Sequence, residues 1–559
     1  MNERLENLLR AYAESDAYAF HMPGHKRRLM PGWPAEAGAI DITEIDGFDN
    51  LHDAQEILAE EMKSAAAFYG AQETIFSVNG STCGMLAAIS AAVPEGGRIL
   101  IERTSHMSVY HAAYLRKLHV SYIKEGVCAP PKEEDRNTED EARCAEIPAE
   151  GASNGSNLDP ENRRIRTESA ADKELDASDE KIDAVVITSP GYEGCVRDIT
   201  AWAAFAHRRG ACLIVDGAHG AHLGIHTYFP ESAVRQGADI VVMSTHKTLP
   251  AMTQTALIHN VTGRVPSKRL HFFMDIYETS SPSYVLMASI TGALHFLYDH
   301  GKEAFSIYAD RLRKIRREIS GLKNFALAGG EDSVLLTDGE LPPFPAGTRM
   351  DPGKLVILTS DGNALYDVLR ERYHLQMEMR APGYVLAMTS PADTEEGFER
   401  LAAALRELDS EDHWAAPKSG SVGTKSGSAS KAVSISESRV SEKCESAEDM
   451  GPAVAAGRQG MPVQKLRICE AVDAPCEVLP LREAEDRISG DFVILYPPDA
   501  PLIVPGELIT KEVIEGIEMW IDRGYFVMGV DNGNISCVTS EKLNPIKDSG
   551  RRKSKRKTP

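Results

Sequence analysis

The sequence has few cysteines and no long hydrophobic run, and both shortages exclude classes of protein. No stretch approaches the ~20 consecutive apolar residues that a membrane-spanning helix needs. The N-terminus, MNERLENLLRAYAESDAYAF, is charged and amphipathic and lacks the apolar run of a signal peptide. The 9 cysteines in 559 residues form no CxxC pair and no zinc-site spacing, which is typical of reduced thiols and predicts no metal site. We therefore expect a cytoplasmic protein without a membrane partner.

Positive charge is also scarce. The chain has 61 Lys and Arg against 83 Asp and Glu, a formal net charge of −22 at pH 7. Nucleic-acid binding needs clustered Lys and Arg to contact phosphates, so we expect no nucleic-acid partner. The acidic balance is compatible with a cationic substrate, although charge alone says nothing about chemistry.

Short apolar runs that alternate with helical patterns predict a large α/β domain over residues 21–300. The runs show little alternation, which is typical of parallel strands buried on both faces. They are TIFSV (74–78), RILIE (98–102), AVVIT (184–188), CLIVD (212–216) and DIVVM (239–243). Helical spacing predicts a helix across residues 52–70 with Gly70 as its stop, and an amphipathic helical arm across residues 1–20.

The rest of the chain divides by composition. Residues 129–180 hold 16 acidic and 7 basic side chains and no aromatic residue, so we expect a disordered surface insertion. A second α/β pattern predicts a small domain over 301–410, and a Ser- and Gly-rich stretch predicts a flexible linker over 411–463. A third compact piece follows over 464–545, and residues 546–559 form a basic tail.

The most informative segment is ADIVVMSTHKTLPAMTQTALIH (238–259). An apolar strand delivers Ser244, His246 and Lys247 to its carboxyl end, where open α/β sheets bind ligands. A lysine in such a pocket can lose its proton and attack an aldehyde carbon. A solvated lysine at a strand end is the alternative, and the segment alone does not decide between them.

Asp216 ends a second apolar strand in CLIVDGAHGAH (212–222). A carboxylate there can pair with the protonated ring nitrogen of pyridoxal phosphate (PLP), which that cofactor needs to accept electrons. An aspartate that caps the turn before Gly217 is the alternative. The combination of a strand ending in Asp and, about thirty residues later, a strand ending in Ser-x-His-Lys favours the cofactor.

Two further elements are consistent with a PLP site. Gly80, Ser81 and Thr82 open a helix directly after a strand, where backbone N–H groups and hydroxyls suit a phosphate, although Ser and Thr are also ordinary N-cap residues. His106, in RTSHMSVYHA (103–112), follows another strand and could lie against an aromatic cofactor, although a single His is more often structural.

Together these residues resemble the Orn/Lys/Arg decarboxylase family of fold type I PLP enzymes, in its short form without an N-terminal wing domain. The resemblance covers most of the chain outside the two polar stretches, and departs from the family pattern at Asp499, where the family usually has Gly, and at the insertion 129–180. The motifs that carry it are HMPGHK (21–26), DITEIDGFDNLHDA (41–54), VNGSTCGM (78–85), RTSHMSVYHA (103–112), TSPGYEGCVRDI (188–199), VDGAHGAH (215–222), STHKTLPAMTQTALIH (244–259), SSPSYVLMASI (280–290) and YPPDAPLIVPGE (496–507).

The resemblance implies a fold and a set of residue roles. The fold is an aspartate aminotransferase-like large domain with a mainly parallel sheet, a smaller α/β domain and a C-terminal α+β domain. Lys247 would bind PLP as a Schiff base, Asp216 would keep the pyridine nitrogen protonated, and His106 would stack on the ring. The remaining cofactor contacts would be Gly80, Ser81, Thr82, His219, Ser244 with His246 beside it, and Ser281 from a second subunit of a homodimer or a multiple of dimers.

The implied reaction is decarboxylation of arginine, lysine or ornithine to an amine and CO2, which feeds polyamine or diamine formation. Catalysis would involve Lys247 or a neighbouring His, His106 or His246, as the proton donor to Cα. The cationic end of the substrate needs an acidic group; the candidates are Asp41, Glu44 and Asp46, with Glu507 second, and each could instead be a solvated or capping carboxylate.

Two alternative functions remain open at this stage. One is another fold type I enzyme, an aminotransferase or β-eliminating lyase, in which an arginine such as Arg380 or Arg400 would hold the α-carboxylate. The other is a catalytically inactive homologue, against which the presence of both Lys247 and Asp216 argues.

Overall fold

The structure is a computed structural model that describes residues 16, 18–20, 48–123, 181–329, 349–411, 414, 463–496, 500–522 and 524–539. The predicted insertion at 129–180, almost all of the predicted linker and the basic tail lie outside these residues. Within the described part of the chain, no helix is both long and apolar enough to cross a bilayer.

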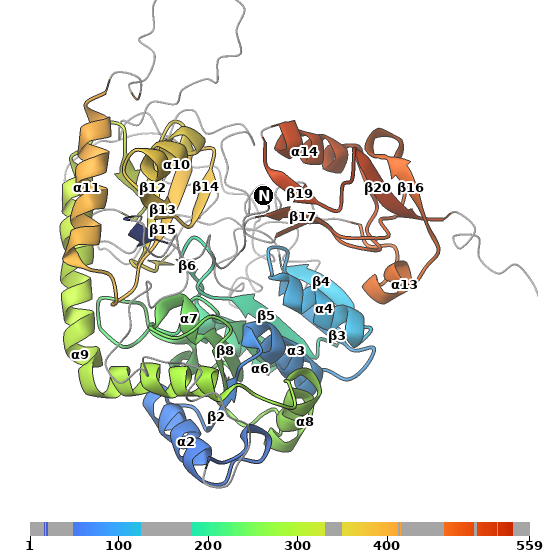
Figure 1. Cartoon of the computed structure of the whole chain (residues 1–559). Helices are drawn as coiled ribbons and strands as arrows, with labels where there is room; N and C mark the ends of the chain where they lie inside the picture. Colours follow the sequence, from blue (N-terminus) through green and yellow to red (C-terminus); the bar gives the residue numbers. More distant parts are fainter. Residues whose placement is uncertain are drawn as a thin grey trace, which may run out of the picture.

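A seven-stranded sheet in the order β2-β9-β8-β7-β5-β3-β4 forms the centre of the large domain (Figure 1). All its strands run in one direction except β9, which is antiparallel to both neighbours. The strands are β2 (Glu73–Ser77), β3 (Arg98–Glu102), β4 (His119–Ile123), β5 (Ala184–Thr188), β7 (Cys212–Asp216), β8 (Ile240–Ser244) and β9 (Ala256–Asn260). The predicted mainly parallel sheet is confirmed, and two of the five predicted strands are shifted by one residue.

The continuous apolar strands are explained by helices on both faces of this sheet. Successive strand residues point to opposite faces, so Leu213 and Val215 join one core cluster while Cys212 and Ile214 join the other. The first cluster contains α2 (Ile57–Tyr69), α6 (Ile199–Arg208) and the first half of α9 (Tyr284–Ser320). The second contains α3 (Gly80–Ala92), α4 (Met107–Leu115) and α8 (Ser267–Tyr277).

The first helix of the large domain is shorter than predicted. The helical pattern across 52–70 becomes a 3-10 turn, η2 (Leu51–Asp53), followed by α2. The Asp49 carboxylate explains the late start, because it accepts hydrogen bonds from the backbone N–H groups of Glu56 and Leu58. The helix ends as predicted at Gly70, whose φ of 89° is a left-handed conformation that glycine adopts without steric cost.

A single 37-residue helix, α9, joins the large and small domains. It runs along the large domain, turns a corner and continues beside the small domain (Figure 1). The predicted domain boundary at residue 300 therefore falls inside a helix. The small domain is an antiparallel sheet in the order β10-β12-β15-β14, packed with α10 and α11. Its elements are β10 (Ala326–Leu327), β12 (Lys354–Leu358), α10 (Gly362–Glu371), β13 (Leu375–Met377), β14 (Met379–Ala381), β15 (Tyr384–Met388) and α11 (Glu395–Asp409).

The prediction of a helix over residues 1–20 is wrong at the C-terminal end of that range. Tyr18–Phe20 form a strand, β1, that pairs in parallel with β13, and residues 1–15 lie outside the described residues. The pairing buries Phe20 completely, and the Tyr18 hydroxyl donates to Asp393. These tertiary contacts outweigh the helical spacing of the apolar residues. A second short pair joins β11 (Arg349–Met350) to β6 (Cys195–Val196).

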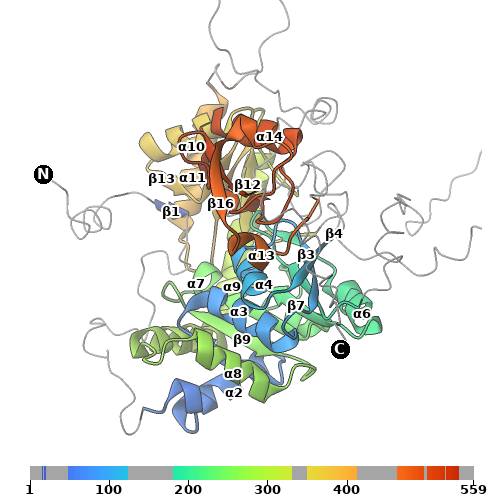
Figure 2. The ribbon, with the colours of Figure 1, turned by 90° about the vertical axis from the view of Figure 1, so that its right-hand side faces the viewer.

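The C-terminal domain has its own core around Trp520. Its sheets have the orders β18-β17-β19 and β16-β20. Helix α13 lies against α4 of the large domain, as the second view also shows (Figure 2). The elements are α13 (Ile468–Val472), β16 (Cys476–Pro480), η8 (Leu481–Glu483), β17 (Val493–Tyr496), β18 (Ala500–Ile503), α14 (Lys511–Asp522), β19 (Phe526–Met528) and β20 (Asn534–Val538).

Candidate active site

Two neighbouring parallel strands end at the residues that the sequence singled out. Strand β7 ends at Asp216 and β8 ends at Ser244, and the two are paired in parallel from Ile214 with Ile240 to Asp216 with Val242. The four-residue helix α7 (Thr245–Thr248) follows β8 at once and holds Lys247. Because carboxyl ends of parallel strands meet at one edge of a sheet, Asp216 and Lys247 lie at the same edge.

The Lys247 amine is in a setting that favours its uncharged form. Its Nζ atom lies 3.1 Å from Nε2 of His219. Burial lowers the pKa of Lys247, although the charges of Asp216 and Glu378 act in the opposite direction. A lysine with a lowered pKa is a better nucleophile near neutral pH.

The Asp216 carboxylate caps the turn that follows β7, which is one of the two roles predicted for it. Its Oδ1 atom accepts a hydrogen bond of 3.1 Å from the backbone N–H of Ala218, which is the turn-capping alternative. The side chain is buried, and among the described residues none donates to its Oδ2 atom. This oxygen is therefore open to a further donor, and the protonated ring nitrogen of PLP is a donor of the required kind.

Hydroxyl groups and a helix start are placed together for a phosphate. The buried Ser244 hydroxyl donates to Oγ of Ser81 at 2.9 Å. Gly80 opens α3 with a φ of 78°, and the preceding N-cap residue, Asn79, makes no side-chain bond to the first turn. The first N–H groups of α3 therefore lack a side-chain acceptor from their own cap and suit an anion. Thr82 is exposed at the same turn.

The two other histidines named from the sequence have structural bonds. His106 caps α4, since its Nδ1 accepts from the backbone N–H of Ser108 at 3.1 Å, yet its charge also contributes to the environment of His219. His246 is held by a 3.0 Å bond between its Nδ1 and the carbonyl oxygen of Thr255. Both roles in the cofactor site stay predictions.

The structure brings three further polar residues to this site that the sequence did not single out. Lys354, the first residue of β12, lies with Nζ 2.7 Å from Nδ1 of His219. The Tyr192 ring packs against the His219 ring, and its hydroxyl donates to Glu378 at 2.5 Å. Lys354 carried a signal that was available in the sequence, because a lysine at the start of the apolar run KLVILTS is as unexpected as one at the end of DIVVMSTHK.

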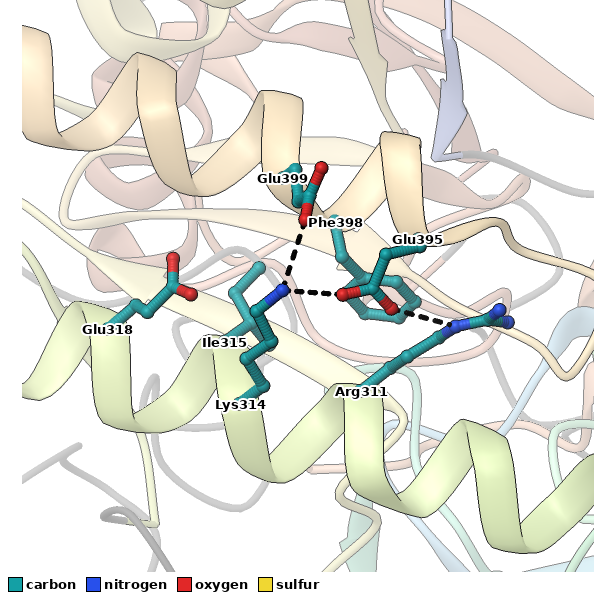
Figure 3. A pocket seen from close by; sticks show the side chains of 7 residues that line it. All are labelled: Arg311, Lys314, Ile315, Glu318, Glu395, Phe398 and Glu399. Atoms are coloured by element: carbon teal, nitrogen blue, oxygen red, sulfur yellow. Dashed lines mark hydrogen bonds and ion pairs between the residues drawn. The ribbon is translucent and has the colours of Figure 1, made fainter.

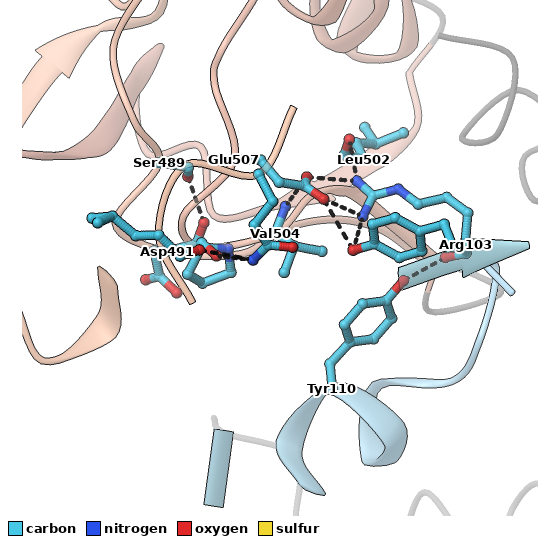
Figure 4. Close-up of polar contacts among 11 residues, drawn as sticks. Arg103, Tyr110, Ser489, Asp491, Leu502, Val504 and Glu507 are labelled. Atoms are coloured by element: carbon cyan, nitrogen blue, oxygen red, sulfur yellow. Dashed lines mark hydrogen bonds and ion pairs between the residues drawn. The ribbon is translucent and has the colours of Figure 1, made fainter. Parts of the chain in front are cut away.

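The candidate substrate carboxylates are not brought together by the described residues. Asp41, Glu44 and Asp46 lie outside them. Glu507 is fully buried, and both of its oxygens bind Arg103, at 2.8 and 2.9 Å (Figure 4). Because Tyr122 and the backbone N–H of Val504 also donate to this carboxylate, we no longer propose Glu507 as a substrate contact.

The candidates from the alternative reaction and from the second subunit lie elsewhere. Arg380 pairs with Asp367 at 3.1 Å, and Arg400 donates to backbone carbonyls of Asp16 and Tyr373. These contacts give both arginines a structural role. Ser281 lies exposed in the connection between α8 and α9, so a role across a subunit interface stays a prediction.

A second polar cluster lies between α9 and α11 and does not have the properties of a catalytic site. Lys314 pairs with Glu395 and Glu399, and Arg311 pairs with Glu395 (Figure 3). The carboxylates already have cationic partners on the facing helix, which indicates helix packing.

Comparisons with known proteins agree with this site. The family model described as Orn/Lys/Arg decarboxylase, major domain, matches residues 4–125 and 159–344, and the model for its C-terminal domain matches residues 463–522. The chain is 27% identical to the arginine decarboxylase of Bacillus subtilis (strain 168), over 95% of this chain and 96% of that protein. It is also 27% identical to the arginine decarboxylase of Halalkalibacterium halodurans, over 90% of each chain.

The fold has a solved counterpart in the constitutive lysine decarboxylase of Escherichia coli. That structure is 19% identical with a TM-score of 0.66, and the match covers 96% of this chain and 81% of that one. At this identity the likeness establishes the fold. With both family models matched in order, the chain belongs to the Orn/Lys/Arg decarboxylase family, the PLP-dependent enzymes that remove CO2 from basic amino acids.

Proposed function

We propose that this enzyme decarboxylates arginine and that Lys247 and Asp216 bind its PLP from opposite sides of the ring. The observation that carries the assignment of residues is the meeting of the half-buried Lys247 side chain, whose pKa is lowered, and the buried Asp216 carboxylate at adjacent strand ends. Arginine is favoured among the three basic amino acids because relatives that match over almost their whole length are named arginine decarboxylases. The product amine would enter polyamine formation.

Each residue of the site has a physical task in this proposal. PLP supplies an electron sink for the pair left behind when the carboxylate departs as CO2. Asp216, through Oδ2, holds the proton on the ring nitrogen that keeps this sink effective. Lys247 would supply the uncharged amine that holds the cofactor, and it is a candidate proton donor to Cα of the substrate.

The other groups bind and orient. Ser81, Ser244 and the N–H groups at the start of α3 would hold the phosphate, with Thr82 and His246 as further candidates, and His106 would stack on the ring. Asp41, Glu44 and Asp46 remain our candidates for the acidic contact to the substrate's cationic end. They are chosen for charge complementarity, since the far end of arginine, lysine or ornithine is positive.

Assembly and location are part of the same proposal. We infer a homodimer, or a multiple of dimers, in which Ser281 reaches the partner subunit's phosphate site. Phe272 and Ile276, on α8, are exposed apolar side chains of the kind found at such interfaces. A cytoplasmic location is supported by the free thiols of the described cysteines, among them Cys83, Cys195 and Cys212.

The test is CO2 release from arginine, lysine and ornithine, each labelled at the carboxyl carbon, with PLP added. We expect release from arginine above the other two, and no release from any substrate by Lys247→Ala, which also loses the visible absorbance of bound PLP. Lys314→Ala removes a half-buried lysine of α9 that pairs with Glu395 and Glu399 away from the site, and serves as the matched control with unchanged turnover. Formation of a keto acid without CO2 would instead identify an aminotransferase.

Asp216→Asn separates cofactor binding from catalysis. It keeps the shape of the side chain but removes the charge that retains the ring proton. We expect PLP still to bind while turnover falls by on the order of 10²–10³-fold, the usual loss when one aligned electrostatic contact is removed. Undiminished turnover in this variant would contradict the assigned role.

A further inference from the structure

His219 connects two lysine amines that come from different domains. Its Nε2 atom lies 3.1 Å from Nζ of Lys247, at the end of β8, and its Nδ1 atom lies 2.7 Å from Nζ of Lys354, in β12 of the small domain. His219 and Lys354 are both buried, with 5% and 3% of their surface exposed. The three side chains form a continuous hydrogen-bonded row.

Hydrogen-bond chemistry limits how many protons this row can hold. A neutral imidazole has one donor and one acceptor nitrogen, and a lysine ammonium can only donate. If His219 is neutral, both bonds persist when one amine, charged or uncharged, donates to the imidazole while the other is uncharged and accepts from it, so the row holds at most one extra proton. With both amines charged, one of them would face an N–H group and its bond would break.

His219 is held neutral by its surroundings. Burial lowers the pKa of His219 well below its usual value, and the neighbouring Lys247 and Lys354 lower it further. His246 and His106 act in the same direction.

The charges around the two amines favour a single shared proton. Burial lowers the pKa of Lys354 to about 7 despite nearby carboxylates. The charged and titratable groups that face Lys354 are Asp351 beside it on the chain, Glu378 between β13 and β14, Glu193 after β5, and Lys247. Those that face Lys247 are Asp216 and Glu378. The Asp351 carboxylate also has its own partner, His222, at 3.0 Å.

We propose that Lys354 is a positioning residue that shares one proton with Lys247 through His219, and so keeps the Lys247 amine available for the cofactor aldehyde. The proposal rests on the proposed function only in giving Lys247 the role of nucleophile. When the proton is on Lys354, the charged amine of Lys354 donates a hydrogen bond to Nδ1 of His219. The Nε2–H group of His219 then donates a hydrogen bond to the uncharged amine of Lys247. When the proton is on Lys247, the bonds reverse. No bond other than N–H is made or broken.

This sharing changes how Lys247 responds to pH. An isolated lysine loses its uncharged form about tenfold for each pH unit below its pKa. In the shared row, a proton taken up below pH 7 is divided between the two amines, so the uncharged fraction of Lys247 levels off.

The test measures that fraction directly with acetic anhydride, which acetylates only uncharged amines. The full-length chain is treated with hydroxylamine to free Lys247, and acetylation of Lys247 is followed by peptide mass spectrometry from pH 5.5 to 10. We expect the wild-type rate to level off below about pH 7, near the lowered pKa of Lys354, and the Lys354→Met rate to continue to fall by about tenfold per pH unit. Lys314→Met, which replaces a half-buried lysine of the α9–α11 ion pairs, is the matched control and should follow the wild type.

Profiles of wild type and Lys354→Met that superimpose would overturn the proposal. Methionine is apolar and similar in length, so the buried site should accept it, and circular dichroism checks the fold. If that variant does not fold, His219→Leu breaks both bonds while leaving both amines, and should also abolish the levelling. Because the reagent needs neither PLP nor substrate, this result is independent of whether the decarboxylase assay succeeds.

Discussion

Removal of the Glu507 side chain should loosen the C-terminal domain from the large domain. Arg103 follows β3 of the large domain, and Glu507 lies in the loop after β18, 404 positions later in the chain. Their side chains are 5% and 0% exposed. Glu507→Ala would leave the Arg103 guanidinium buried without its carboxylate.

The size of the effect follows from this burial. Burial by itself lowers the pKa of Arg103, but the Glu507 charge, together with Tyr122 and Tyr110, more than reverses this, so the guanidinium stays charged. Removing one partner of a buried ion pair costs about 3–5 kcal/mol because the remaining charge is desolvated and unpaired. The loss also frees two further donors to the carboxylate, the Tyr122 hydroxyl and the Val504 N–H. We expect the free energy of local opening at this contact to fall by about 3–5 kcal/mol.

Amide hydrogen exchange followed by mass spectrometry measures this opening at the segment around Val504. A loss of that size corresponds to exchange that is faster by about 10²–10⁴-fold. Glu477→Ala is the control in the same domain, because its pair with Arg487 is 44% and 22% exposed and should contribute only about 0–1 kcal/mol. The double variant Arg103→Met with Glu507→Met should recover most of the protection, since apolar residues often replace a buried pair without loss.

Two results would refute this reasoning. One is a Glu507→Ala variant whose exchange at Val504 matches that of Glu477→Ala. The other is a double variant that is as unprotected as the single one, because the loss would then arise from packing and not from an unpaired charge.

Two further changes test the phosphate site and a buried histidine. Ser244→Ala removes the hydroxyl that donates to Ser81. We expect the Kd for PLP, measured by fluorescence titration, to rise by about 10–100-fold, which is the equivalent of one hydrogen bond to a charged group. An unchanged Kd would place the phosphate elsewhere. Burial lowers the pKa of His259 to about 3, so the unfolded chain binds more protons than the folded one below pH 6.5. Wild type should therefore lose about 2 kcal/mol of unfolding free energy relative to His259→Gln between pH 7 and pH 5, measured by urea denaturation at both values, and an equal change in the two proteins would contradict it.

The sequence located the site's central strands because their physical cause is local. Strands β7 and β8 are buried on both faces and so read as continuous apolar runs, and a Lys or Asp directly after such a run is conspicuous. The five predicted strands could therefore be placed to within one residue. Their order could not, since strand order depends on contacts between segments far apart in the chain.

The partners of the site residues were not available from the sequence for the same reason. Lys354 contacts His219 across 135 positions, and nothing near either residue specifies the other. Glu507 seemed free to meet a substrate until its contact with Arg103 was seen. Strand β1 was missed because its pairing with β13 outweighs a local helical pattern.

The unbroken course of α9 has a consequence for how the chain can change in length. A helix advances about 1.5 Å and rotates about 100° with each residue. One residue inserted into α9 would therefore swing everything beyond it, Lys354 included, around the helix axis and away from Lys247. Insertions and deletions should accordingly be absent from Tyr284–Ser320 in homologues that retain the activity, whatever freedom of length their connecting segments have.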